Sequence, residues 1–479
     1  MNGARWSVDA VTNYCPLSTV HGPSPAISTA PLPLPPGPSR RFPGDFVLQF
    51  ARRPVAFLER LTREHGDVAT FTMGRERMVL VNHPDLIRDV LVTHNRNFRK
   101  GRGLERAKRL LGEGLLTSEG ELHRRQRRLA QPAFHRQRVA AYGGVMAEYA
   151  ARTASRWRDG ATVNVGEEMM RLTLAIVART LFDADVEDAE AAGVGEALTE
   201  AFRSFTFAML PFGELLEKLP VPPVRRFNRA RDRLDRTIYR MIAERRAAGD
   251  DRGDLLSMLL LAHDTEGDGS GMTDTQLRDE AMTIFLAGHE TTANALTWSL
   301  YLLSRHPEVE ARLHAEVDAA LGAGPAARLP TADDMAALPY TRMVLAEAMR
   351  LYPPAWIIGR RAIDAYPIRD WVLPPRTIVL VSQYVTHRDA RFWPDAARFD
   401  PERWTPEAQA GRPKFAYFPF GGGPRICIGE QFAWMEGVLL LATIARHWRL
   451  RGPAMEIAVR PMITLRPAEP VIMRVEARE

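Results

Sequence analysis

The chain has 479 residues, of which 46% are hydrophobic and 25% are charged, and these proportions exclude collagen-like, low-complexity and wholly disordered proteins. Its net charge of +6 comes from 64 basic and 58 acidic residues that are interspersed along most of the sequence. A nucleic-acid-binding protein concentrates its basic residues in a stripe, so we expect no nucleic acid among the partners.

Residues 1–40 are rich in proline, serine and threonine and have no hydrophobic periodicity. They predict a flexible leader, and residues 41–479 predict one large domain. The two cysteines, Cys15 and Cys427, lie far apart, and Cys15 belongs to the leader. We therefore expect no disulfide and a cytoplasmic location. No run of 18 apolar residues and no signal peptide occurs, so we expect a soluble protein without a transmembrane anchor.

Beyond the leader, the patterns predict a mainly α protein with small β-sheets. Residues 68–73 and 78–81 flank a short polar segment that begins with Gly74, which is typical of a β-hairpin. Residues 377–382 predict another strand, whereas most other apolar residues recur at helical spacing. Residues 220–223, Pro-Val-Pro-Pro, indicate a turn between two helices.

Residues 281–292 read Ala-Met-Thr-Ile-Phe-Leu-Ala-Gly-His-Glu-Thr-Thr, an apolar helix interrupted by polar residues. Taken alone, they allow two interpretations. One is a core helix that bends at Gly288, with threonine hydroxyls bonded back to backbone carbonyls. The other is a helix that carries an acid, Glu290, and a hydroxyl, Thr291, to a reaction site.

The most informative segment is residues 420–429, Phe-Gly-Gly-Gly-Pro-Arg-Ile-Cys-Ile-Gly, which precede an apolar helix predicted over residues 430–447. The turn and the helix start place the sulfur of Cys427 at the positive end of that helix, where backbone N–H groups favour a thiolate. With no second cysteine or histidine cluster nearby, the loop suits the single axial ligand of a haem better than a zinc or iron–sulfur site. Phe420 would pack against the macrocycle, which the glycines allow to approach closely.

This loop resembles the haem-binding loop of the cytochrome P450 superfamily, and other segments match the same family in the same order. The matching segments are Ala287-Gly288 with Glu290-Thr291, the pair Glu347 and Arg350 before Leu-Tyr-Pro-Pro, and residues 399–404 with Arg403. The resemblance covers residues 41–479. It implies the single-domain cytochrome P450 fold, a triangular prism with the haem between a long distal helix and the helix after the cysteine loop.

The resemblance also implies a role for each matched residue. Cys427 would be the thiolate ligand of haem b, Thr291 would hydrogen-bond the reacting oxygen, and Glu290 would help to relay protons from solvent. The other expected cofactor contacts in the two haem-flanking segments are Phe420, Gly429, Ala287 and Gly288. The expected structural triad, buried beneath the haem and not catalytic, is Glu347, Arg350 and Arg403.

Haem propionates are anions and require basic or hydrogen-bonding partners. His123 and Arg127 match the family's W-x-x-x-R motif, with histidine in place of the usual tryptophan. Arg425 in the cysteine loop is a third candidate. The resemblance gives Arg360 as a fourth, although the neighbouring Arg361 could take its place.

The helix of His123 also carries a basic cluster, Arg124, Arg125 and Arg128. This cluster is either a solvated helix face or a docking site for an acidic electron donor. Because the 52 residues after Cys427 are too few for a reductase domain, we expect separate redox partners, a ferredoxin or flavodoxin and its reductase.

Together these features predict a bacterial-type, monomeric monooxygenase of secondary metabolism. It would use O2 and electrons from NAD(P)H to hydroxylate or epoxidise a hydrophobic small molecule such as a terpene, fatty acid or polyketide. Residues 202–212 predict an apolar lid, and Ile284, Phe285 and Trp356 are among the expected pocket walls. Two alternatives remain: a peroxygenase driven by hydrogen peroxide, which usually lacks the acid–alcohol pair, and a non-enzymatic haem sensor.

Overall fold

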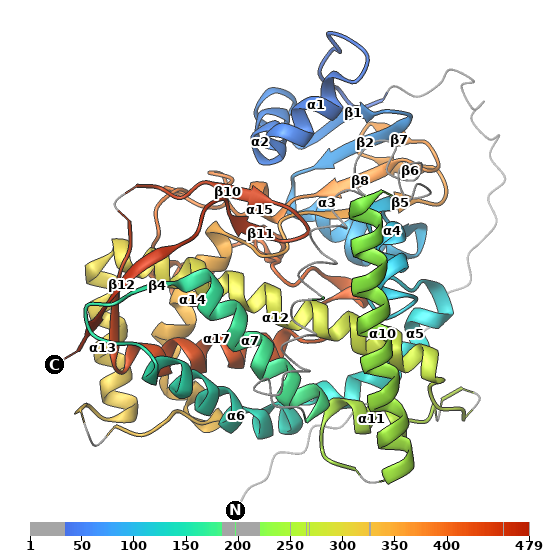
Figure 1. The fold of residues 1–479 in the computed structure, drawn as a ribbon. Helices are drawn as coiled ribbons and strands as arrows, with labels where there is room; N and C mark the ends of the chain where they lie inside the picture. The colour runs from blue at the N-terminus through green and yellow to red at the C-terminus, as the bar shows by residue number, and fades with distance from the viewer. Residues whose placement is uncertain are drawn as a thin grey trace, which may run out of the picture.

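The computed structural model describes residues 34–183, 197, 221–249, 251–264, 266–267, 269–324, 327–453 and 455–478. Most of the predicted leader and the whole of the predicted lid, residues 202–212, lie outside these ranges. The described residues form a mainly helical protein with small sheets, as the sequence predicts (Figure 1).

The helices surround one long central helix, α12. The α-helices are α1 (Asp45–Arg52), α2 (Pro54–His65), α3 (Pro84–Arg88), α4 (Arg102–Leu111), α5 (Gly120–Ala130), α6 (Arg136–Ser155), α7 (Val165–Phe182), α10 (Pro222–Ala248), α11 (Leu255–Leu261), α12 (Asp274–Arg305), α13 (Pro307–Leu321), α14 (Pro339–Leu351), α15 (Gln383–Thr386), α16 (Pro406–Gln409) and α17 (Glu430–Ala445). A short 3-10 helix, η8 (Gly423–Arg425), lies in the cysteine loop.

The strands lie mostly at one end of the molecule, beside α1 and α2 (Figure 1). They are β1 (Val68–Met73), β2 (Glu76–Val81), β3 (Phe98–Lys100), β4 (Thr162–Asn164), β5 (Ile358–Ala362), β6 (Tyr366–Ile368), β7 (Trp371–Leu373), β8 (Ile378–Val381), β9 (Trp448–Arg451), β10 (Val459–Pro461), β11 (Leu465–Pro467) and β12 (Ile472–Ala477). The largest sheet has the order β1-β2-β8-β5-β3, and the β4-β12-β9, β10-β11 and β6-β7 sheets are smaller.

The predicted hairpin and the predicted later strand are confirmed, and they belong to the same sheet. β1 pairs with β2 in antiparallel register, Val68 opposite Val81. β2 then pairs with β8 in parallel, Val79 opposite Val379, although the paired residues are 300 positions apart. The end of the predicted leader also contacts this sheet, because the carbonyl of Pro36 accepts a hydrogen bond of 2.7 Å from the Thr70 N–H.

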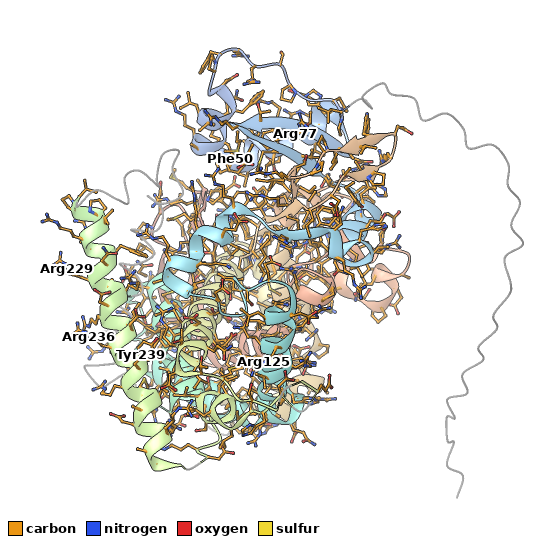
Figure 2. All side chains as sticks on the ribbon, turned by 90° about the vertical axis from the view of Figure 1, so that its right-hand side faces the viewer. Phe50, Arg77, Arg125, Arg229, Arg236 and Tyr239 are labelled. Atoms are coloured by element: carbon orange, nitrogen blue, oxygen red, sulfur yellow. The ribbon has the colours of Figure 1, made fainter. Side chains whose placement is uncertain are left out.

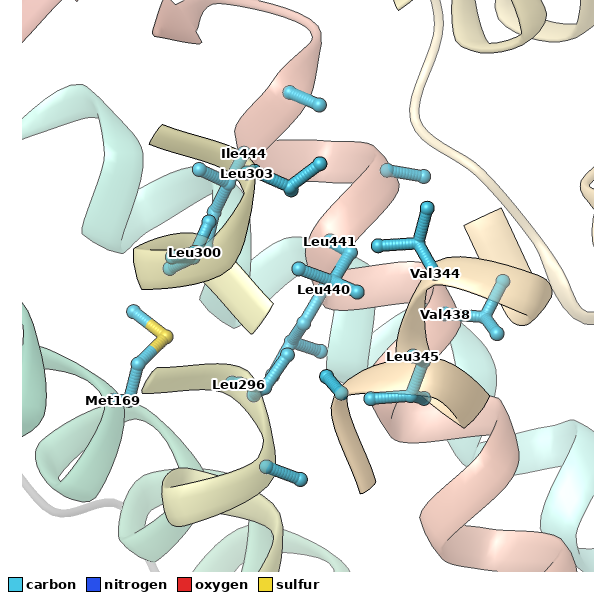
Figure 3. Packing of buried hydrophobic residues seen from close by; sticks show 14 of the residues in the cluster. Met169, Leu296, Leu300, Leu303, Val344, Leu345, Val438, Leu440, Leu441 and Ile444 are labelled. Carbon is cyan, nitrogen blue, oxygen red and sulfur yellow. The ribbon is translucent and has the colours of Figure 1, made fainter. Parts of the chain in front are cut away.

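The main core lies where α12 packs against α7, α14 and α17. α12 begins with a capping box in which Thr273 and Gln276 bond each other's backbone N–H groups. Its C-terminal half is buried almost throughout, and the buried residues there include the polar Asn294, Thr297 and Ser299. Figure 3 shows this packing at residues Met169, Leu296, Leu300, Leu303, Val344, Leu345, Val438, Leu440, Leu441 and Ile444. Within the described ranges, no helix is long and apolar enough to cross a bilayer.

Candidate functional site

The cysteine loop, residues 420–429, is a tight turn that contains η8 and is followed directly by α17. The Cys427 N–H donates to the Phe420 carbonyl at 3.0 Å, and the Phe420 ring packs on Trp434 of α17 with centroids 5.7 Å apart. Gly423 has φ +69°, and a Cβ there would lie 2.1 Å from the carbonyl oxygen of Leu91. Only glycine fits such a position, so the loop's shape depends on it.

The environment of the Cys427 sulfur differs in one respect from the expectation. The side chain has an exposed surface, yet the protein around it is dense enough that burial raises the pKa of the thiol to about 11. The Gly429 N–H and the Arg127 charge act in the opposite direction, as the helix-terminus argument predicts. Burial outweighs them, so the protein groups alone favour the neutral thiol.

Helix α5 contacts the loop directly. Arg127 donates from Nη1 to the carbonyl of Ile426 at 2.7 Å. His123, one turn earlier, is buried, and burial with the nearby Lys100 and Arg425 charges lowers its pKa to about 4. His123 is therefore a neutral imidazole at pH 7, which can donate a hydrogen bond.

Buried cations converge beside the loop. Lys100 of β3 lies opposite Arg360 of β5 in the antiparallel register, and both side chains are buried. Burial, with repulsion from Arg425, lowers the pKa of Lys100 to about 7 and that of Arg360 to about 10. Lys100 Nζ already donates to the carbonyls of Leu115 at 2.9 Å and Ser118 at 2.6 Å. An anion beside this pair would therefore be held mainly by Arg360 and Arg425.

The carboxylate of Glu119 pairs with part of this cation cluster, and one nitrogen of Arg425 stays without a hydrogen-bond partner within the described ranges. Glu119 accepts from the Lys100 N–H at 2.5 Å and from Arg425 Nη2. The buried Nη1 of Arg425 has no hydrogen-bond partner in the described part of the chain. An unpaired buried guanidinium nitrogen is costly, and a bound carboxylate would satisfy it.

The alternation of β5 distinguishes Arg360 from Arg361. Successive side chains in a strand point to opposite faces. Arg360 faces the cation cluster, whereas Arg361 faces acids on the other side, with N–O distances of 3.4 Å to Glu105 and 3.9 Å to Glu76. Of the two arginines, Arg360 has the geometry required of a propionate partner.

Helix α12 is continuous through the acid–alcohol segment. The Thr291 hydroxyl donates to the carbonyl of Ala287 at 2.7 Å, so the back-bonding interpretation is correct for this hydroxyl. Ala287 is nevertheless exposed and Thr291 is half-buried, in a helix whose other residues there are mostly buried. This face of α12 is therefore accessible to a small molecule.

Gly288 lies beside that face and contacts another helix. A Cβ on Gly288 would lie 3.1 Å from Cγ2 of Val177 in α7. The missing side chain thus allows α12 to approach α7, where the resemblance implies a contact with the cofactor. That implied role of Gly288 stays a prediction.

Glu290 is held by the strand β11 and the turn before it. Its carboxylate accepts from Arg466 Nε at 2.7 Å and from the Thr464 hydroxyl, which also accepts from Asn294 at 3.1 Å. Only 3% of the Glu290 side chain is exposed, against 30% of Arg466. The carboxylate therefore has a cationic partner that reaches the surface.

Glu347, Arg350 and Arg403 come together as the sequence predicts. Glu347 and Arg350 are fully buried and form two hydrogen bonds of 2.8 Å. Arg403 Nε lies 3.4 Å from the Glu347 carboxylate. The same carboxylate accepts from the Asp400 N–H and from Trp404 Nε1, both at 3.0 Å. These bonds join α14 to the segment that leads to the cysteine loop.

Sequence reasoning missed a buried acid, Glu436, in the middle of α17. Its side chain is fully buried, and both carboxylate oxygens lack a hydrogen-bond partner within the described residues. Burial raises the pKa of Glu436 to about 8. The nearby side chain of Thr292 in α12, the neighbour of Thr291, opposes this rise in part. A lone acid in the apolar run Phe432–Ala445 was the available signal.

The raised pKa of Glu436 predicts a specific pH dependence. Folding takes up a proton at Glu436 at any pH between its ordinary unfolded value and about 8, so its contribution to stability falls as pH rises through that window. Glu436→Gln, which is always neutral, is expected to gain stability relative to wild type from about pH 5 to pH 8. Thermal unfolding of both proteins across this range measures the difference, and Glu407→Gln at an exposed position is the control. A difference that is constant with pH would contradict the assignment.

The basic cluster of α5 is largely paired within the chain. Arg128 forms hydrogen bonds of 3.0 Å to both carboxylate oxygens of Asp264, and Arg125 lies 3.5 Å from the same carboxylate. Arg124 pairs with Glu121 of its own helix. These contacts favour a solvated and internally paired helix face over a free cationic docking site.

Two of the expected pocket walls lie in core packing. Trp356 is buried, stacks on Phe50 with centroids 6.5 Å apart and donates to the Met462 carbonyl at 2.9 Å. Phe285 is buried against Phe182. Their role as substrate contacts stays a prediction.

Comparisons with known proteins agree with this geometry. A family model described as Cytochrome P450 matches residues 35–471. Cyclooctatin synthase of Streptomyces melanosporofaciens is 42% identical over 422 residues, which cover 88% of this chain and 90% of the relative. Pentalenene oxygenase of Streptomyces avermitilis is 37% identical over 420 residues, with 88% and 90% covered.

A second relative from S. melanosporofaciens, cyclooctat-9-en-7-ol 5-monooxygenase, is 40% identical over 436 residues, which cover 89% of this chain and 93% of the relative. The fold is also similar to a solved structure, the crystal structure of cytochrome P450DA heme domain. That match has a TM-score of 0.84 at 28% identity and covers 94% of this chain and 99% of the other.

Proposed function

The chain belongs to the cytochrome P450 family and is a haem-thiolate monooxygenase, and we propose that Cys427 ligates its haem and that its substrate is a cyclic terpene. The observation that carries the site assignment is the cation cluster beside the cysteine loop. In this cluster Arg425, which has one buried nitrogen without a hydrogen-bond partner among the described residues, and the buried residues Lys100 and Arg360 lie beside the loop that carries the exposed side chain of Cys427.

The described residues fit a haem. Cys427 offers one soft ligand, and Arg360, Arg425 and the neutral His123 offer donors for two carboxylates. Arg127 fixes the loop through the Ile426 carbonyl and favours the thiolate by its charge. When bound, the haem supplies oxygen activation, which thiolate ligation favours. The chain's part is to hold that group, exclude water and deliver protons.

We propose that Thr291 and Glu290 deliver the protons that the reaction consumes. The Thr291 hydroxyl lies on the accessible face of α12, and among the described residues its one hydrogen bond is to its own helix. It can therefore turn its proton towards a reacting oxygen on that face. Glu290 is the residue before Thr291 and forms an ion pair with the partly exposed Arg466. It can exchange protons with solvent through water.

Thr291→Ala is expected to keep haem binding and stability while uncoupling electron use from product formation. Product per NAD(P)H should fall about tenfold or more, because general acid–base groups contribute at least that much, and hydrogen peroxide should rise to match. Both quantities are measured in one assay. Thr297→Ala is the matched control, since Thr297 makes the same 2.7 Å back-bond on the same helix. Full coupling in Thr291→Ala would disprove the proton-delivery role.

A hydrophobic, polycyclic substrate follows from two observations. Around Thr291, the accessible face of α12 offers Ala287, a small residue that leaves room and contributes no charge. The relatives named above, among them pentalenene oxygenase, are named for reactions of terpenes. We propose that this chain inserts one oxygen atom into such a hydrocarbon skeleton.

Titration of the purified haem protein with candidate substrates tests this assignment. Cyclic di- and sesquiterpenes should displace water from the site and change the spin state of the iron, which is read as a shift of the Soret band. Fatty acids and macrolides of similar hydrophobicity serve as controls. A shift with those controls but none with any cyclic terpene would overturn the terpene assignment and leave the monooxygenase class intact.

Electrons would come from NAD(P)H through a separate ferredoxin or flavodoxin and its reductase. The internal pairing of Arg125 and Arg128 with Asp264 weakens the case for the α5 cluster as a docking site. Arg124, which is exposed and pairs only locally, remains available to an acidic partner.

A further inference from the structure

Helix α10 carries a large excess of positive charge, although acidic and basic residues alternate along most of the chain. It contains nine arginines and three acids, a net charge of +6 that equals the net charge of the whole chain. α10 lies at the edge of the molecule, with one side on α12 (Figure 1). Its buried side is apolar, with Phe227, Ala230, Leu234, Ile238 and Ile242.

All three acids of α10 form ion pairs, and so do several of its arginines. The ion pairs of α10 with described residues include Arg231 with Asp232 and Asp235, Arg240 with Glu244, Arg278 with Asp235, Arg245 with Asp254 and Arg246 with Asp274. None of these pairs uses the arginines at positions 225, 229, 233 and 236.

We call Arg225, Arg229, Arg233 and Arg236 the α10 stripe. All four are exposed, and none forms an ion pair with an acid in the described ranges. Their spacing of four, four and three residues places them on one side of the helix over about 17 Å. Figure 2 shows Arg229 and Arg236 pointing outwards from the helix at the edge of the molecule.

We propose that the α10 stripe binds the phosphate groups of an anionic phospholipid bilayer. A row of guanidinium groups on the outermost helix can contact a flat anionic surface at every position. The only large hydrophobic side chain exposed on α10 is Tyr239, at 40%. The contact is therefore electrostatic, at the headgroups, without the apolar face that insertion requires.

The chemistry of the face favours a lipid surface over an acidic protein. Specific protein interfaces have a core in which charged residues are depleted and aromatic or apolar anchors are enriched, which the stripe lacks. A lipid surface also concentrates hydrophobic molecules, so adsorption would bring the enzyme to its substrate. This last argument rests on the proposed function, whereas the charge and geometry do not.

Co-sedimentation of the holoprotein with vesicles tests the proposal without substrate or turnover. The protein is expected to bind vesicles that contain one-third phosphatidylglycerol in phosphatidylcholine, to be released by high salt, and not to bind pure phosphatidylcholine. No binding to the anionic vesicles at low salt would overturn the proposal. Because the terpene titration uses vesicle-free protein, failure of one experiment leaves the other result standing.

Variants locate the contact. Arg225→Gln with Arg229→Gln and Arg236→Gln should weaken binding about a hundredfold, since each arginine near an anionic surface contributes roughly a fivefold step. The matched control replaces three exposed arginines by glutamine near the β4-β12-β9 sheet, Arg158, Arg449 and Arg474, and should bind like wild type. Circular dichroism and haem content establish that both variants fold.

Two results would contradict the assignment to α10 or to lipid. Equal losses in the two triple variants would mean that net charge alone attracts the protein to the vesicles. Tighter, stripe-dependent binding to double-stranded DNA than to anionic vesicles at the same salt concentration would make nucleic acid the partner.

Discussion

Cys427→Ser is expected to abolish the red-shifted Soret band of the reduced, carbon-monoxide-bound protein, and monooxygenase turnover with it. A serine hydroxyl cannot replace the soft thiolate as a haem ligand. The loop itself should survive, because the Cys427 N–H bond to Phe420 belongs to the backbone and the glycine turns are unchanged. The cation cluster is untouched, so part of the haem should stay bound, which pyridine haemochrome analysis measures.

Cys15→Ser is the control for this variant, since Cys15 is the other cysteine of the chain. It should keep the band and the activity. If Cys427→Ser retained the red-shifted band, another residue would be the ligand and the site built around this loop would be wrong.

Glu347→Gln is expected to destabilise the fold by about 3–5 kcal/mol, the range for removing one partner of a buried ion pair. Glu347 accepts two hydrogen bonds from Arg350, one from the Asp400 N–H and one from Trp404. Arg403 lies 3.4 Å from the same carboxylate. An amide can accept at only one oxygen and leaves two arginines without a countercharge. Denaturant unfolding followed by far-ultraviolet circular dichroism measures the loss, and haem retention should fall in parallel.

The exposed pair of Arg312 and Glu402 provides the comparison. Glu402 lies in the same region of the chain as Arg403, but 47% of its side chain is exposed. Glu402→Gln should change stability by about 0–1 kcal/mol, as surface pairs do. Similar effects of Glu347→Gln and Glu402→Gln would show that the triad is not the structural element described here.

Patterns local in the sequence predicted the parts of the molecule that depend on local physics. The hairpin at residues 68–81, the strand at β8, the helix after Cys427 and the Glu347–Arg350 pair each follow from periodicity, glycine placement or helical spacing. Periodicity also indicated the helical class with small sheets, and the order of the motifs was enough to identify the family.

Features that depend on distant pairings could not be read in advance. Lys100 opposes Arg360 only because β3 pairs with β5, some 260 positions later. Arg128 is neutralised by Asp264, 136 positions away. Whether a basic segment is a free cationic surface therefore depends on tertiary contacts. For that reason the row of exposed arginines without an acidic partner in the described ranges lies on α10, whereas Arg125 and Arg128 of α5 are paired with Asp264.

The pKa of the Cys427 thiol also depends on residues distant in the sequence, and could not be predicted from the local segment alone. The position at a helix start correctly indicates that the Gly429 N–H favours the thiolate. The opposing effect, burial, depends on how densely the rest of the chain surrounds the loop and exceeds it. A metal cation bound at this sulfur would favour the thiolate.

Incubation of the purified protein with a cyclic terpene, NAD(P)H, a ferredoxin, its reductase and isotopically labelled oxygen gas tests the central claim most directly. Mass spectrometry of the product should show one labelled oxygen atom, the second atom appearing in water, and the reaction should be lost in Cys427→Ser. A product whose oxygen derives from water, or a reaction unchanged in Cys427→Ser, would contradict the account.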